Sequence, residues 1–179
     1  MKIAVCGASD SANSEEVKKK AFEIGKILAQ NNVLVLTGAS YGYPQSAAKG
    51  AFSNNGKVMG ISPAKDENEH ISKYMFSVDY YTKLEFTGMG IPGRNFPLVA
   101  EADAIIIIGG QIGSLNEFTI AFHQKKPIGV LENSGGITSL IEKIAEICSK
   151  TNEKNNIVYS SDPKELVSLV IDKLKNDAK

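Results

Sequence analysis

The sequence contains nineteen lysines but a single arginine, Arg94. This arginine lies in a stretch rich in glycine and proline, residues 88–95, which we expect to be a loop. A guanidinium group grips phosphate or carboxylate with a planar fork of donors that lysine lacks. Because the chain otherwise uses lysine for positive charge, Arg94 is a candidate for binding an anionic ligand; the alternative is a chance surface residue.

A second distinctive stretch follows the apolar run 104–108, which holds four consecutive isoleucines. The run stops at Gly109-Gly110, and the pattern of a helix follows Ser114. A short β-branched run of this kind is typical of a strand buried on both faces of a parallel sheet. Glycines let the backbone approach a ligand, and a new helix directs free N–H groups toward it. The turn at 109–114 therefore suits an anion, phosphate above all.

Glu117 has two interpretations. With Ser114 three residues before it, it forms the pattern of a capping box, in which the carboxylate satisfies N–H groups at a helix start. A carboxylate beside a glycine turn is also well placed to act as a general acid or to stabilise positive charge on a sugar ring. One residue can do both, so both interpretations stay open.

The rest of the chain alternates between short apolar runs and helical patterns. The expected helices separate the runs, and Asn13 is expected to cap the first of them. This alternation predicts an α/β fold, a single-domain, doubly wound parallel sheet over residues 1–179 with helices on both faces. The expected strands are residues 2–6, 33–36, 58–61, 104–108, 127–131 and 157–159.

In such a sheet, ligands bind at the carboxyl ends of the strands. The loops expected there are residues 7–11, 37–42 and 109–114. The first loop lacks the G-x-G-x-x-G pattern, and the second strand does not end in an acidic residue that would hold a ribose of NAD. The chain also lacks the P-loop pattern of ATP hydrolysis. These observations favour a mononucleotide or a similar phosphorylated ligand.

Residues 63–83 interrupt the rhythm, with a polar run followed by clustered aromatic side chains. A connection of this length is a lid, a binding loop or an interface in most proteins, or its aromatics form a local packing cluster. His70 lies among charged residues, and we expect it to be exposed. A short helix is expected at 96–102.

The composition excludes several classes of protein. Basic and acidic residues balance, which gives no support to nucleic-acid or membrane-surface binding. No apolar run approaches the roughly 20 residues that span a bilayer. Cys6 and Cys148 show no metal or redox spacing, and we interpret them as buried thiols of a cytoplasmic protein. We expect no metal site.

Several of these residues resemble a known family. The pattern Gly110-x-x-Gly113-Ser114-x-x-Glu117 resembles the P-G-G-x-G-T-x-x-E signature of the LOG ("lonely guy") family, also known as lysine decarboxylase-like proteins. The turn 37–42 is similar to that family's glycine-rich turn, and residues 6–9 to its first turn. Gly93-Arg94-Asn95 resembles the related molybdenum-cofactor carrier proteins. The chain departs from the signatures at Gly109, at Gln111 and at Asn95, where LOG enzymes carry proline, glycine and lysine.

The resemblance implies a Rossmann-like homodimer, or a higher homo-oligomer, that binds a nucleotide 5′-monophosphate. LOG enzymes hydrolyse the N-glycosidic bond and release the base and ribose 5-monophosphate. Carried over by position, Arg94 and Glu117 are the catalytic residues. The resemblance also implies the residues that bind the substrate: Ser9, Thr37, Gly38, Gly42, Asn95, Gly110, Gly113 and Ser114.

Three functions stay open at this point. The first is a phosphoribohydrolase, the second a non-catalytic nucleotide or pterin-cofactor carrier, and the third an interaction protein that uses residues 74–81. Nothing in the matched residues supports decarboxylation, which would need pyridoxal phosphate held by a lysine. We therefore expect no resident cofactor, a small phosphorylated ligand, and neither a nucleic acid nor a membrane as partner.

Overall fold

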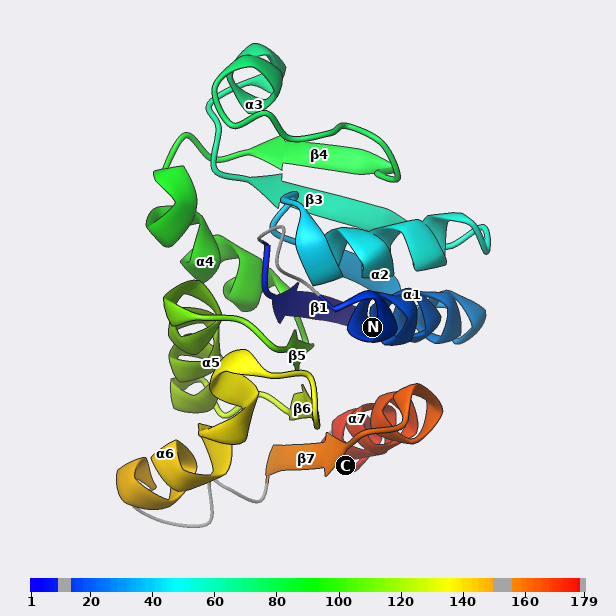
Figure 1. Cartoon of the computed structure of the whole chain (residues 1–179), viewed down its shortest axis with the longest axis vertical. Coiled ribbons are helices and arrows are strands. Elements are labelled where there is room, and N and C mark those ends of the chain that lie inside the picture. Colours follow the sequence, from blue (N-terminus) through cyan, green and yellow to red (C-terminus); the bar gives the residue numbers. More distant parts are fainter. Residues whose placement is uncertain (10–13, 150–155, 178–179) are drawn as a thin grey trace.

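The computed structural model describes residues 1–9, 14–149 and 156–177, and its strands form one parallel sheet (Figure 1). The sheet has seven strands in the order β4-β3-β2-β1-β5-β6-β7. The strands are β1 (Lys2–Gly7), β2 (Leu34–Thr37), β3 (Val58–Ser62), β4 (Lys83–Phe86), β5 (Ala104–Ile108), β6 (Ile128–Leu131) and β7 (Ile157–Ser160). The predicted doubly wound α/β fold is confirmed.

Helices cover both faces of this sheet. In chain order they are α1 (Glu15–Gln30), α2 (Gly42–Phe52), α3 (Glu67–Ser72), α4 (Gly90–Glu101), α5 (Ile112–His123), α6 (Ile141–Cys148) and α7 (Pro163–Asp177), with a short 3₁₀ turn η1 (Gly136–Ser139) before α6. Residues 10 and 11 of the first predicted loop, and the predicted cap Asn13, lie outside the described ranges.

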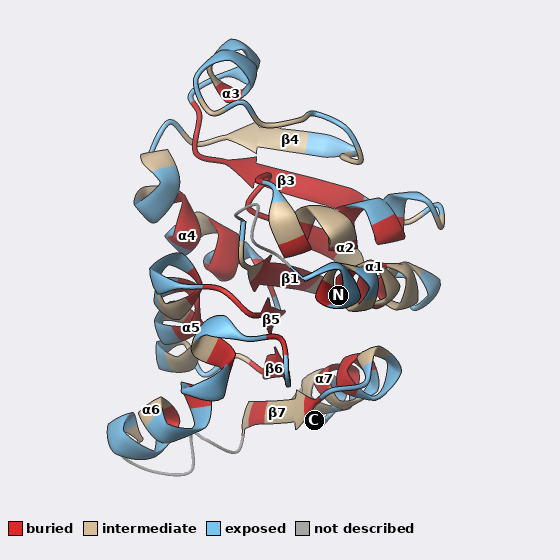
Figure 2. Cartoon of the chain, viewed as in Figure 1, coloured by how far each residue is buried: buried red, intermediate tan, exposed pale blue. Residues whose placement is uncertain are grey.

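The inner strands send alternate side chains to two separate hydrophobic cores. Ile106 and Ile108 of β5 point toward α1, α2 and α7, whereas Ile105 and Ile107 point toward α4, α5 and α6. All four isoleucines are fully buried (Figure 2). The apolar run 104–108 therefore forms the predicted central strand because both of its faces are covered by helices.

The chain winds in two directions away from the middle of the sheet. From β1 it proceeds through β2 and β3 to β4 on one side, and from β5 through β6 to β7 on the other. β1 and β5 are neighbours, with Gly7 opposite Ile108 at their carboxyl ends. A reversal of strand order opens a crevice at that edge, where open α/β sheets bind their ligands.

The stretch between β3 and α4 differs from the expectation. It contains α3 and the edge strand β4, which pairs with β3. His70 on α3 is fully buried rather than exposed: its Nδ1 lies 2.8 Å from Ser62 Oγ, and its ring packs against Phe76 and Phe86. The charged neighbours of His70 made the prediction wrong. One face of a short helix can be buried while its other face, with the charged residues, is exposed to solvent.

The two cysteines also differ from each other. Cys6 is buried in β1 as expected, but Cys148 at the end of α6 is exposed. The buried face of α6 is formed by Ile141 and Ala145, and Cys148 does not continue it. The expectation of a buried thiol was therefore wrong for Cys148.

Candidate functional site

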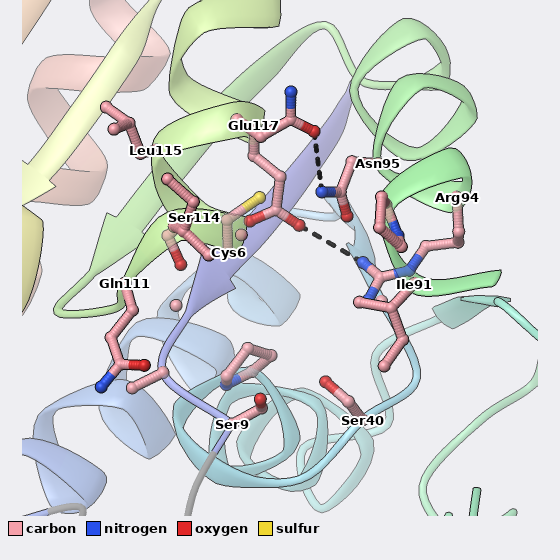
Figure 3. A pocket seen from close by; sticks show the side chains of 18 of the residues that line it. Cys6, Ser9, Ser40, Ile91, Arg94, Asn95, Gln111, Ser114, Leu115 and Glu117 are labelled. Atoms are coloured by element: carbon pink, nitrogen blue, oxygen red, sulfur yellow. Dashed lines mark hydrogen bonds and ion pairs between the residues drawn. The ribbon is translucent and has the colours of Figure 1, made fainter.

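A cavity of 920 Å³ opens at the carboxyl ends of β1 and β5, where the strand order reverses. The turns after β1 and β2 form one side of it, and the first halves of α4 and α5 form the other (Figure 3). Its size falls in the range of about 300–1,000 Å³ that small-molecule sites occupy.

An ion pair between Arg94 and Glu117 lies in the wall of this cavity. Nη1 of Arg94 donates a hydrogen bond of 3.3 Å to Oε1 of Glu117, and only 6% and 7% of the two side chains is exposed. Arg94 comes from α4 and Glu117 from α5, so the packing of these two helices brings the charges together. Arg94 and Glu117 are the only charged side chains among the described residues that line the cavity.

The turn after β2 supports the guanidinium group of Arg94. A Cβ atom at Gly38 would overlap Nη1 and Cζ of the arginine, so only glycine leaves room for it there. Arg94 Nε is buried and has no acceptor among the described residues. A buried donor without a partner costs free energy, so the position of Arg94 is not optimised for stability alone.

Opposing effects act on the pKa of the Glu117 carboxyl, and burial is the largest of them. Burial raises the pKa of the Glu117 carboxyl, while the charge of Arg94 and hydrogen bonds from Cys6 and Arg94 act in the opposite direction. Burial, and next the charge of Glu117, raise the pKa of the Cys6 thiol well above its ordinary value. Cys6 therefore stays protonated and donates to Glu117, beside which its sulfur lies in Figure 3.

The start of α5 forms another side of the cavity. Gly109 and Gly110 both have left-handed backbone conformations, with φ of +58° and +92°. A side chain on Gly110 would also overlap Ser114, whereas a Cβ atom on Gly113 would meet no atom within 4 Å. The backbone of α5 is thus bare at Gly113, where it lines the cavity, and the unpaired N–H groups of a helix start suit an anion.

A pair of amides lies next to the ion pair. Nδ2 of Asn95 donates a hydrogen bond of 2.9 Å to Oδ1 of Asn116, and both residues line the cavity. Asn95 follows Arg94 on α4 and Asn116 precedes Glu117 on α5. The same helix packing that forms the ion pair therefore forms this neutral pair beside it.

Most of the predicted site residues meet at this cavity. Those that line it are Arg94, Glu117, Ser9, Gly38, Asn95, Gly113 and Ser114. Three others do not. Thr37 turns away and accepts a hydrogen bond from the N–H of Ala39, Gly42 lines a neighbouring cavity of 520 Å³, and Gly110 shapes the turn below Ser114.

Two local predictions at the site were wrong. Arg94 lies on a helix and not in a loop, because α4 begins at Gly90, six residues before the expected start. Ser114 is not a helix cap, because α5 already begins at Ile112. Glu117 therefore lies inside the helix and reaches Arg94, and the capping-box interpretation does not hold.

Other residues at the cavity escaped the sequence analysis as site residues. Cys6 was interpreted only as a core thiol, although its place at the end of a strand beside a glycine turn was a usable signal. Ser40 lies in the predicted second turn, and Asn116 adjoins Glu117. Ile91 contributes an apolar wall from the first turn of α4.

The described residues offer neither a metal site nor a membrane span. They contain no cluster of three or more His, Cys, Asp or Glu side chains that could hold a metal ion. Within the same ranges, every helix is too short or too polar to cross a lipid bilayer.

Several solved structures of other proteins have the same fold. The molybdenum cofactor binding protein of Rippkaea orientalis is 25% identical, with a TM-score of 0.79 over 96% of this chain and 95% of its own. The molybdenum cofactor carrier protein of Chlamydomonas reinhardtii is 23% identical, with a TM-score of 0.79 over 97% and 98% of the two chains. The DNA processing protein A of Helicobacter pylori is more distant, at 17% identity and a TM-score of 0.67 over 96% and 80%.

Sequence comparison gives the family. An uncharacterized protein of Archaeoglobus fulgidus is 30% identical over 132 residues, which are 74% of this chain and 80% of the relative. The model of the SLOG cluster4 family matches residues 1–167. This match spans the whole cavity and confirms the resemblance to LOG and molybdenum-cofactor carrier proteins. The chain, with its reversed strand order and its Arg94–Glu117 pair at the β1–β5 crevice, belongs to the SLOG cluster4 family.

Proposed function

We propose that the protein binds a nucleoside 5′-monophosphate in the cavity at the β1–β5 crevice and hydrolyses its N-glycosidic bond. The observation that carries this proposal is the buried Arg94–Glu117 pair, which lies in the same cavity as the bare start of α5 at Gly113. A phosphorylated sugar needs both features, a seat for the phosphate and a carboxylate near the ring.

The phosphate group would bind to the N–H groups at the start of α5 and to the hydroxyl of Ser114, which makes no hydrogen bond to a described residue. Ser114 is almost completely buried and lines the cavity. Its hydroxyl is therefore a donor that a ligand oxygen can use at little cost in desolvation.

Glu117 would act on the sugar. As the bond between the base and C1′ breaks, positive charge develops on the ring, and an ionised carboxylate stabilises it. Water then adds to C1′ and gives a proton to Glu117, while the base leaves with the electrons of the broken bond and takes a proton from solvent. Arg94 keeps the buried carboxylate available in its ionised form, because its positive charge opposes the effect of burial on the pKa of Glu117.

A second function has its own support. The solved relative from Rippkaea orientalis is described as a molybdenum cofactor binding protein. Asn95, where LOG enzymes carry lysine, leaves this cavity with one positive charge fewer than the LOG pattern, and Gln111, where they carry glycine, makes the turn bulkier. Both changes suit a ligand that is held and released without chemistry. The alternative proposal is therefore a carrier of a phosphorylated pterin in the same cavity.

We also propose a homodimer. The apolar side chains Ile91, Phe96 and Ile112 are exposed near the start of α4 and of α5, and Ile91 and Ile112 line the mouth of the cavity. Exposed apolar side chains gathered at one place favour association with a partner. Sedimentation at several protein concentrations tests this proposal, and a monomer at all of them would contradict it.

The enzymatic proposal is tested by incubating the protein with AMP, GMP and CMP and measuring free base by chromatography. We expect release of base by the wild type and by Glu16→Gln, a control on the exposed surface of α1, and none by Glu117→Gln. If the wild type releases no more base than Glu117→Gln, hydrolysis is excluded. Thermal stabilisation by the nucleotides and by phosphorylated pterins then decides between a carrier and no ligand at this cavity.

A further inference from the structure

The amide pair of Asn95 and Asn116 is incomplete as it stands. Asn95 is only 3% exposed, and its Nδ2 is used in the hydrogen bond to Asn116. Its Oδ1 accepts no hydrogen bond from the residues that the structure describes. This oxygen is not enclosed in the interior, because Arg94 Nε is the one enclosed side-chain polar atom without a partner among the described residues; Oδ1 is therefore open to solvent. In this protein the atom belongs to a residue that lines the cavity.

The Oδ1 atom of Asn95 is a hydrogen-bond acceptor, so it can bind only a group that donates. An amide oxygen repels the oxygens of a phosphate and attracts an O–H or N–H group. The carboxylate of Glu117, on the neighbouring position of α5, is an acceptor as well. Beside the Arg94 guanidinium, this wall of the cavity therefore offers acceptors at Asn95 and Glu117, whereas the start of α5 offers the N–H donors at residues 112–114 and the hydroxyl of Ser114.

The cavity is thus divided by polarity along α5. A phosphate fits the donor end, and a group rich in O–H fits the acceptor wall about one helical turn away. In a nucleoside monophosphate the group at that distance from the phosphate is the ribose. Its two neighbouring hydroxyls are O–H donors, and one of them can supply the hydrogen bond that Asn95 Oδ1 lacks.

We propose that Asn95, held in place by Asn116, is a specificity-determining residue that accepts a hydrogen bond from a ribose hydroxyl and so selects ribose over deoxyribose ligands. This inference rests on the proposed nucleotide binding but not on hydrolysis. Figure 3 shows Asn95 on the side of the cavity that also holds Glu117 and Arg94, opposite Gln111.

The test compares two ligands, AMP and 2′,3′-dideoxy-AMP, by isothermal titration calorimetry, with the nucleotide checked by chromatography after each titration. The wild type should prefer AMP by about tenfold, the effect of one buried hydrogen bond. Asn95→Leu removes the acceptor, so its affinity for the two ligands should be equal. Asn31→Leu, which changes an exposed asparagine at the end of α1, should keep the wild-type preference.

A further variant separates recognition from folding. Asn95→Asp keeps an acceptor at this position, so it should bind all phosphates more weakly but retain the preference for AMP even if Asn95→Leu is unstable. Equal binding of the two ligands by the wild type, or an unchanged preference in Asn95→Leu, overturns the inference while nucleotide binding stands. A loss in Asn95→Leu that is the same for both ligands assigns the amide to the base instead and also overturns it. If the wild type binds neither nucleotide, the proposed function fails and the inference with it.

Discussion

Gly38 and Arg94 pack so closely that no side chain larger than hydrogen fits at residue 38 without moving the guanidinium group. Gly38→Ala should therefore displace Arg94 from Glu117. Because the displaced arginine no longer supports the ligand site, we expect the affinity for AMP to fall by about tenfold or more, the loss expected for one charge-assisted hydrogen bond.

Calorimetric titration measures this loss, and a double variant shows its origin. In Arg94→Ala the space beside Gly38 is free, so adding Gly38→Ala should have little further effect on the affinity. If the two losses instead add, Gly38 acts on the ligand directly, and its proposed support of Arg94 is wrong.

Gly113→Ala should separate binding from stability. A Cβ atom at Gly113 meets open space, and alanine favours a helix over glycine by roughly 0.5–1 kcal/mol. The free energy of unfolding should thus stay the same or rise. The added methyl group occupies the place that a phosphate would take, so the affinity for AMP should fall. Urea unfolding and calorimetric titration of the same preparation measure the two effects, and an unchanged affinity would remove the phosphate from this turn.

Glu117 should make stability depend on pH in an uncommon direction. Burial raises the pKa of its carboxyl above the ordinary 4.5. Between pH 4.5 and the raised value, the native state holds a proton that the unfolded chain has lost. The free energy of unfolding contributed by this group is therefore greatest at low pH, falls as pH rises through that interval and is constant above it.

Each unit of raised pKa corresponds to about 1.4 kcal/mol. Urea unfolding of the wild type and of Glu117→Gln between about pH 4 and pH 8 isolates the effect, because all other carboxyl groups titrate in both proteins. The stability of the wild type minus that of Glu117→Gln should decrease with rising pH. An increase would mean that the charge of Arg94 outweighs burial in the folded protein.

Lys126 should stabilise the helix that carries Arg94. Its Nζ donates hydrogen bonds to the carbonyl groups of Val99, Ala100 and Ala102 at the end of α4. Lys126→Met removes these bonds from carbonyls at the end of α4, and should lower the free energy of unfolding by about 1–3 kcal/mol. The same change at the exposed Lys57 is the control and should have an effect within about 0.5 kcal/mol of zero. Equal effects at both positions would show that Lys126 is not a cap.

The central part of the fold could be predicted from the sequence because its signals are local. The isoleucine run of β5 predicts a buried strand, and the glycines that follow it predict a turn that can bind a ligand. Neither prediction needs information about the rest of the chain. β4 could not be predicted, because Lys83 and Glu85 alternate with Leu84 and Phe86 over only four residues. A strand this short forms because it pairs with β3, and the sequence of the strand itself does not indicate that pairing.

Some residues of the site could be predicted from the sequence, but not the contacts between them. Arg94 and Glu117 stood out by residue type, but their contact depends on how α4 packs against α5. Helix α4 was itself underestimated, since Gly90 and Pro97 both count against a helix. Burial of Leu98 and Val99 against the sheet outweighs these propensities. The neutral partner of Asn95 could be identified only from the coordinates.

Strand β4 borders the sheet, with Lys83 and Glu85 ion-paired at 2.5 Å on one of its sides. Charges on an outermost strand discourage another chain from adding a strand of its own, because that pairing would strip them of water. This border is thus protected against edge-to-edge aggregation, a hazard that grows when a protein is abundant. In the proposed homodimer, contacts through Ile91 and Ile112 would tune assembly and the ligand cavity together, because both side chains belong to the same two helix starts.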